Sequence, residues 1–212
     1  MAADNRIERM IREQIIARGI QDARVIQAFR EVPRERFVEG ALKEQAYADY
    51  PLPIGYGQTI SQPYIVALML SALSLQGNER VLEIGAGSGF QTALLAKLAK
   101  KVYSIERVHG LVIFAKRMID QLEIHNAIIK LGDGSIGWKE EAPFDRIIVS
   151  AGAPDMVKQL HIQLVEGGKM LIPIGEEEQQ ELKLFIKTSA GISEQNLGAC
   201  RFVKLIGKYG WK

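Results

Sequence analysis

The sequence is poor in cysteine, in histidine and in excess charge of either sign. Its single cysteine, Cys200, allows no intramolecular disulfide and no multi-cysteine metal site, so we expect a reducing, cytoplasmic location. The three histidines, at positions 109, 125 and 161, are too scattered to suggest a metal site, and we expect no metal. Lys and Arg number 27 against 25 Asp and Glu, which leaves a net charge of +2. This balance predicts no strong attraction to nucleic acid or to an anionic membrane.

Long apolar runs are missing as well. The longest, residues 65–75, contains two serines and is too short to span a bilayer. Residues 1–12 are charged throughout and lack the apolar core of a signal peptide, so we expect no membrane association. The 212 residues, 47% of them hydrophobic, fit one domain, and nothing in the pattern demands more than a monomer.

Apolar periodicity predicts alternating helices and strands over most of the chain. Helical spacing covers residues 4–18, 22–30, 64–75, 90–100, 108–123 and 154–164. Short apolar runs predict strands over 80–84, 101–106, 127–131, 144–150, 169–174, 181–188 and 199–206. Strands that alternate with helices form a parallel sheet covered on both faces. The last two strands have only the turn region 188–198 between them, so we expect antiparallel pairing at one edge.

The strongest generic signal is a glycine-rich turn, Gly85-x-Gly87-x-Gly89, between a strand and a helix. Glycines there let the backbone approach a ligand, and the helix start offers free N–H groups. The spacing differs from the G-x-G-x-x-G of dinucleotide sites, so it suits a pyrophosphate less well. Taken alone, the pattern is also compatible with a tight strand–helix turn.

Two acidic residues follow the next two strands. Glu106 ends the strand after the glycine turn, where a carboxylate can accept hydrogen bonds from both ribose hydroxyls. Asp133 stands between Gly132 and Gly134 after the third strand, where it can accept from an adenine amino group. The alternatives are a surface acid and a simple turn.

These motifs resemble those of class I S-adenosylmethionine-dependent methyltransferases, at residues 83–89, 106, 132–134, 144–150 and 164–172. Upstream, residues 32–38 and 52–63 closely resemble the protein-L-isoaspartate O-methyltransferases, and Gln58-Thr-Ile-Ser-Gln-Pro63 is highly specific to that family. The similarity extends from about residue 7 to residue 206.

The resemblance implies a fold and a reaction. The fold is α/β: a doubly wound, mostly parallel seven-stranded sheet with an N-terminal helical addition and an antiparallel edge strand. Within one domain, 1–212, it implies a helical extension and active-site loop (1–63), a cofactor-binding core (64–175) and C-terminal strands (176–212). The reaction is methyl transfer from S-adenosylmethionine to the free carboxylate of L-isoaspartyl, less well D-aspartyl, residues in damaged proteins and peptides. The ester then returns through a succinimide to aspartyl.

The resemblance also implies residue roles. The active-site hydroxyl corresponds to Ser61, with Thr59 beside it. Cofactor-binding positions are Gln58, Ile60, Glu83, Gly85, Gly87, Ser88, Gly89, Gln91, Glu106, Arg107, Gly132, Asp133 and Gly134. Substrate-binding positions are Ile54, Arg201, Phe202 and Val203. Residues 208–212 match less well and receive no role.

The chemistry is compatible with these residues. A carboxylate with a pKa of about 4 is ionised at neutral pH and needs no general base to attack a methyl group. It needs a near-attack geometry and removal of water. Ser61 and Thr59 can orient it by donating hydrogen bonds. Alternatively, Ser61 caps the helix that starts near Pro63.

Three other functions on this fold fit less well. Amino methylation of a base would call for an Asn/Asp-Pro-Pro-aromatic signature where residues 150–154 read Ser-Ala-Gly-Ala-Pro. Cytosine C5 methylation needs a nucleophilic cysteine, commonly after proline, whereas Cys200 follows alanine. A non-enzymatic binding protein is disfavoured by the intact motif set, and a nicotinamide oxidoreductase by the spacing of the glycines.

Overall fold

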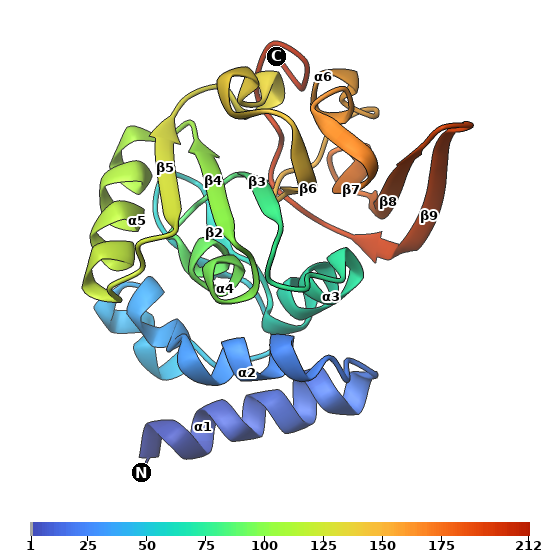
Figure 1. Cartoon of the computed structure of the whole chain (residues 1–212). Coiled ribbons are helices and arrows are strands. Elements are labelled where there is room, and N and C mark those ends of the chain that lie inside the picture. The colour runs from blue at the N-terminus through green and yellow to red at the C-terminus, as the bar shows by residue number, and fades with distance from the viewer. Residues whose placement is uncertain (1) are drawn as a thin grey trace.

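The computed structural model describes residues 2–212 and is built on one seven-stranded sheet (Figure 1). Its spatial order is β5-β4-β3-β6-β7-β8-β9. The strands are β3 (Arg80–Ile84), β4 (Lys101–Glu106), β5 (Ala127–Leu131), β6 (Phe144–Val149), β7 (Leu164–Gly175), β8 (Gln180–Thr188) and β9 (Gly191–Cys200). The strands from β5 to β7 are parallel, while β8 runs antiparallel to both β7 and β9. The predicted α/β class and antiparallel edge are confirmed.

The strand order reverses between β3 and β6. From β3 the chain adds β4 and β5 on one side, and it then returns to β6 and β7 on the other. Ile84 pairs with Val149 at the carboxyl ends of the two central strands. Ligands of open α/β sheets bind where the order reverses in this way. The residues that follow, Gly85 and Ser150, therefore lie side by side at the expected binding edge.

The two faces of the sheet are covered unequally. One face packs against three helices, α3 (Pro63–Leu73), α4 (Phe90–Leu98) and α5 (His109–Gln121), through side chains such as Val81 and Val102. The other face, which includes Leu82 and Tyr103, is covered by the short α6 (Lys158–His161) and nearby loops. Alternate strand residues point to opposite faces, which is why neighbours such as Val81 and Leu82 join different cores.

The N-terminal helices form a further layer beyond α3 and α4 (Figure 1). The predicted helix over 4–18 is α1 (Ala2–Met10), followed by a π-helical turn (Ile11–Ile15) and a 3-10 turn (Ile16–Arg18). Next comes α2 (Ala23–Glu31), and its predicted N-cap is confirmed because Asp22 accepts from the N–H groups of Arg24 and Val25.

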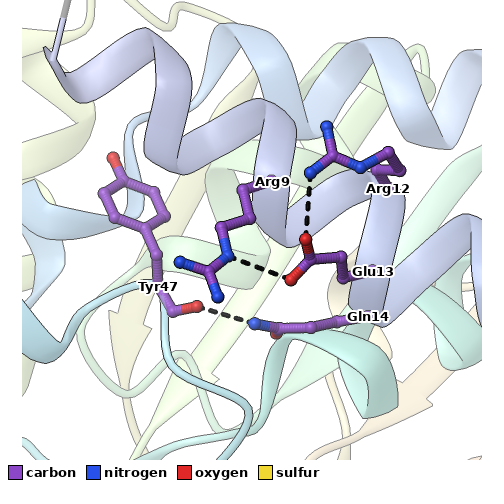
Figure 2. Close-up of polar contacts among 5 residues, drawn as sticks. All are labelled: Arg9, Arg12, Glu13, Gln14 and Tyr47. Carbon is purple, nitrogen blue, oxygen red and sulfur yellow. Dashed lines mark hydrogen bonds and ion pairs between the residues drawn. The ribbon is translucent and has the colours of Figure 1, made fainter.

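A side chain of the π-helical turn anchors the start of the loop segment 47–63. Gln14 donates a 2.8 Å hydrogen bond to the Tyr47 carbonyl, while its neighbour Glu13 accepts from Arg9 and Arg12 (Figure 2). Glu13 is thus held on the helix surface, and Gln14 is the residue that reaches across to the loop.

The breaker-rich segment 47–63 contains a small hairpin. β1 (Leu52–Pro53) pairs antiparallel with β2 (Thr59–Ile60). The segment is preceded by 3-10 turns at Arg34–Phe37 and Gly40–Gln45, and α3 begins at Pro63. Proline suits this first helical position, since its missing N–H would have no partner there.

Three predicted elements differ from the structure by more than two residues. The strand expected over 169–174 is β7, which already begins at Leu164 and ends at Gly175. The helix expected over 154–164 is only Lys158–His161, because β7 begins at Leu164 and bridges at Gly152 and Ala153 tie the preceding chain to the sheet. The strand expected over 199–206 lies earlier, at Gly191–Cys200, and the turn before it is reduced to residues 189–190. Most of β9 is exposed, so it lacks the apolar pattern that marks a buried strand. Among residues 2–212, no helix has the length and apolarity needed to cross a membrane.

Candidate active site

A cleft opens at the carboxyl ends of β3, β4 and β6. It lies at the reversal of strand order, with the β1–β2 hairpin forming another wall. Predicted site residues that line it are Gln58, Thr59, Ile60, Ser61, Gly85, Gly87, Ser88, Gln91, Glu106, Arg107, Gly134 and Val203. The cleft therefore brings together segments 58–61, 85–91, 106–107 and 203, which are far apart in the sequence.

The three glycines of the turn have left-handed backbone conformations, with φ of 89° at Gly85, 55° at Gly87 and 90° at Gly89. Residues with a Cβ are strained there, which explains the choice of glycine. A Cβ on Gly89 would stand 3.2 Å from the backbone of Ala115, and Gly89 does not line the cleft. Gly85 and Gly87 thus face the cleft, while Gly89 allows α5 to pack closely.

Glu106 is nearly buried, and backbone donors hold its carboxylate. Oε2 accepts from the Gly87 N–H and Oε1 from the Val108 N–H, both at 2.9 Å. These bonds tie the glycine turn to the end of β4 and fix the orientation of the carboxylate. A carboxylate has about four acceptor positions, so further donors can bind from the cleft.

Glu83 lies beneath the cleft rather than on its surface. Its fully buried carboxylate accepts hydrogen bonds from Gln91, Thr92 and Ser104. Burial raises the pKa of Glu83 to about 7, although these hydrogen bonds act in the opposite direction. Gln91, held in this way, donates a 2.8 Å hydrogen bond to the Ser150 hydroxyl. Glu83 therefore supports two residues that line the cleft.

Asp133 also lies outside the lining, and the C-terminal tail binds it. Oδ1 accepts from the N–H and hydroxyl of Ser135, and Oδ2 accepts from the Lys208 N–H at 2.7 Å. Burial alone would raise the pKa of Asp133, but the hydrogen bonds from Lys208 and Ser135 outweigh it and keep that pKa below its usual range. Gly132, which packs behind Ile105, does not reach the cleft either. The tail thus occupies acceptor positions that we had expected a ligand to use.

A second cleft adjoins the first. Lining both are four residues, Thr59, Ser61, Ser150 and Val203. The predicted substrate-binding residues Arg201, Phe202 and Val203 all line the second cleft, together with Arg18, Tyr64 and the end of β9. Ile54 instead packs its Cδ1 over Gly87, where a Cβ would meet it at 3.2 Å. Thr59 and Ser61 therefore stand where the two clefts meet.

Ser150 is the residue that the sequence reasoning missed at this junction. It directly follows β6, and a Cβ on Gly85 would lie 3.5 Å from its Cβ. The signal that could have identified it is its place after a central parallel strand at the reversal of strand order. Arg18, which lines the second cleft, could not be predicted from the sequence. Its guanidinium carbon stacks 3.4 Å from the Tyr64 ring centroid, and no local sequence pattern indicates a contact between residues so far apart in the chain.

Comparisons with known proteins agree across almost the whole chain. Residues 5–210 match the family model of protein-L-isoaspartate(D-aspartate) O-methyltransferase. The protein-L-isoaspartate O-methyltransferase of Geobacter metallireducens is 54% identical over 205 residues, covering 96% of this chain and 95% of the relative. That of Syntrophus aciditrophicus is 55% identical, covering 96% and 94%.

A solved structure from Plasmodium falciparum shares the fold. It is described as a protein-L-isoaspartate O-methyltransferase in complex with S-adenosyl-L-homocysteine. It has a TM-score of 0.81 and 30% identity, and the match covers 96% of this chain and 98% of that one. By sequence and by fold, this chain belongs to the protein-L-isoaspartate(D-aspartate) O-methyltransferase family.

Proposed function

We propose that the first cleft of this chain holds S-adenosylmethionine and the second holds a damaged peptide, with their reacting groups at the shared wall. Membership of the family gives the activity, which is methyl transfer to the carboxylate of L-isoaspartyl residues. The observation that carries the residue assignment is that Thr59, Ser61, Ser150 and Val203 line both clefts. A group passed between two ligands must cross such a junction.

The first cleft fits S-adenosylmethionine in its donor and acceptor chemistry. Glu106 offers a fixed, nearly buried carboxylate for hydroxyl donors, and Gly85 and Gly87 leave the backbone open to a close approach. When bound, S-adenosylmethionine supplies a methyl group on a positively charged sulfur.

The second cleft fits an extended peptide. It is lined by Arg201, Phe202 and Val203, which follow β9, and by Gln62, Tyr64 and Ile65 at the start of α3. We assign substrate contact to Arg201, Phe202 and Val203, and place Ile54 against the glycine turn.

At the junction, hydroxyl groups orient the substrate carboxylate. It is already ionised at neutral pH, so no side chain has to remove a proton. Ser61 and Thr59 donate hydrogen bonds that fix its direction. The Ser150 oxygen accepts from Gln91, so its own hydroxyl proton is available for a third hydrogen bond into the site. Neutral donors orient the carboxylate without the stronger stabilisation of its negative charge that a lysine would give.

The experiment uses two peptides that differ only by L-isoaspartyl in place of L-aspartyl. Each is incubated with the protein and methyl-labelled S-adenosylmethionine, and base-labile label is counted. Label on the isoaspartyl peptide alone supports the proposal. Equal label on both, or none on either while calorimetry shows S-adenosylhomocysteine binding, contradicts it.

We also propose that the chain acts as a monomer in the cytoplasm and takes no nucleic acid as substrate. The near-neutral charge and the single cysteine support this. Sedimentation at several protein concentrations tests the oligomeric state, and a second species that grows with concentration would refute it.

A further inference from the structure

The turn of the β1–β2 hairpin has an unusual backbone. Gly55, Tyr56 and Gly57 follow one another with φ of 84°, 54° and 69°, all in the left-handed region. Two glycines accept this conformation freely, but a tyrosine does not. Strain of this kind persists where the surrounding structure enforces it, and it tends to occur at functional sites. Tyr56 is also 67% exposed, so burial of its ring does not explain why it is there.

The tip of the Tyr56 side chain is seated on Gly110, in the first turn of α5. A Cβ at Gly110 would overlap the hydroxyl oxygen and Cζ of Tyr56. Gly110 has no left-handed φ, so its own backbone does not call for glycine. Alanine is the better residue in a helix. The space that Gly110 leaves open is therefore matched to Tyr56.

The hairpin joins this contact to the reaction site. Ile54 and Gln58 close the turn through hydrogen bonds from the Ile54 N–H to the Gln58 carbonyl and from the Gln58 N–H to the Gly55 carbonyl, at 3.0 and 2.9 Å. Pro53 pairs with Thr59 in the hairpin, and Ser61 follows two residues later. On its inner side, Ile54 rests on Gly87. A shift of the turn would thus move Thr59 and Ser61 relative to both clefts.

We propose that Tyr56, seated on Gly110, is a positioning residue that holds the β1–β2 hairpin where Thr59 and Ser61 meet the substrate carboxylate. This inference rests on the proposed function of the junction. Tyr56 does not line either cleft and touches no reacting group. Its contribution is to place the hydroxyl groups of Thr59 and Ser61. A misplacement of catalytic groups by about 1 Å can lower the rate up to a hundredfold.

The test compares Tyr56→Asn, Gly110→Ala and the double variant with the wild-type protein. Asparagine tolerates a left-handed backbone but cannot reach Gly110, so the turn keeps its path without its support. Alanine at Gly110 favours the helix but displaces the tyrosine. We expect each single change to lower kcat about tenfold at saturating S-adenosylmethionine and isoaspartyl peptide. The Kd for S-adenosylhomocysteine should change by less than about threefold, and Tm should not fall.

The double variant distinguishes positioning from general damage. Once Asn replaces Tyr56, Ala at 110 has nothing left to displace, so kcat should fall no further than in the worse single variant. Tyr56→Phe keeps the ring and should retain kcat within about threefold. Matched controls are Tyr50→Asn, at an exposed tyrosine, and Gly40→Ala, where a Cβ meets nothing within 4 Å.

Wild-type kcat in Tyr56→Asn, or single effects that multiply in the double variant, would overturn the positioning role alone. A wild-type protein that transfers no methyl group to the isoaspartyl peptide would overturn the proposed function and the positioning role with it.

Discussion

At the scale of single residues, the proposed site uses hydroxyl groups rather than a charged catalytic side chain. Ser61 lines both clefts, and its hydroxyl is proposed to orient an already ionised carboxylate. A hydrogen bond to a charged group contributes about 1.5–3 kcal/mol. Its loss should therefore affect the rate of transfer far more than the retention of the cofactor.

We predict that Ser61→Ala lowers kcat/KM for the isoaspartyl peptide about tenfold while the Kd for S-adenosylhomocysteine changes less than about twofold. Steady-state kinetics and calorimetry measure the two quantities. Ser193→Ala, on the exposed strand β9, is the matched control. Wild-type kinetics in Ser61→Ala would leave Ser61 with only a structural role before α3.

The buried carboxyl of Glu83 should make stability depend on pH. Its folded pKa of about 7 exceeds the ordinary value of 4.5 because burial disfavours the charge. Between those values the folded state binds more protons than the unfolded state, so stability falls as pH rises through this window. We expect Glu83→Gln to remove that contribution, about 3 kcal/mol at most between about pH 5 and pH 8. Urea unfolding of both proteins measures it, and parallel pH profiles would contradict this expectation.

Residue types and spacing predicted most of the residues that gather at the cleft. They did not predict which carboxylate oxygens already accept hydrogen bonds from other parts of the protein. Glu106, the last residue of β4, lines the cleft and keeps acceptor capacity there. Asp133 occupies the equivalent place after β5, yet the Lys208 N–H reaches it from a tail 75 residues away. Glu83 precedes the glycine turn in the sequence but points into the core. A local sequence pattern does not indicate where a distant tail will bind or which way a side chain will point.

At the scale of elements, buried strands were predictable and exposed ones were not. β3 and β4 begin and end at the predicted residues because their short runs of buried apolar side chains mark them. β9 is almost entirely exposed, so its alternation carries no signal. The hairpin of Leu52–Ile60 was predicted only as a loop, since two-residue strands are too short to show a period.

The C-terminal tail, residues 208–212, should stabilise the loops that follow β5 and β6, because it donates hydrogen bonds to them. Lys208 and Tyr209 donate to Asp133 and Ser135, and the Trp211 ring N–H donates to the Gly152 carbonyl at 3.0 Å. We predict that removal of residues 208–212 lowers the free energy of unfolding by about 1–3 kcal/mol. Urea denaturation measures it, with removal of Lys212 alone as control. An unchanged midpoint would show that these contacts do not stabilise the fold.

At the scale of the whole molecule, the sheet aligns two clefts so that their shared wall carries the polar groups. The reversal of strand order between β3 and β6 places Ser150 beside the glycine turn, and the N-terminal layer places the hairpin opposite. The sequence alone predicted the sheet and most of the cofactor cleft. It assigned roles to Thr59, Ser61 and Val203 but missed Ser150, because the junction is built from three separate segments of the chain that only the fold brings together.

Cys200 provides a direct test of the proposal that the damaged peptide binds in the second cleft. It is the single cysteine, half-buried in the wall of that cleft, and burial raises its thiol pKa to about 11, so alkylation should be slow and sensitive to coverage. With S-adenosylhomocysteine present, its alkylation rate is measured with an isoaspartyl peptide or its aspartyl counterpart at the same concentration. We predict that the isoaspartyl peptide alone slows the reaction. Equal rates with both peptides would contradict the placement of the substrate in this cleft.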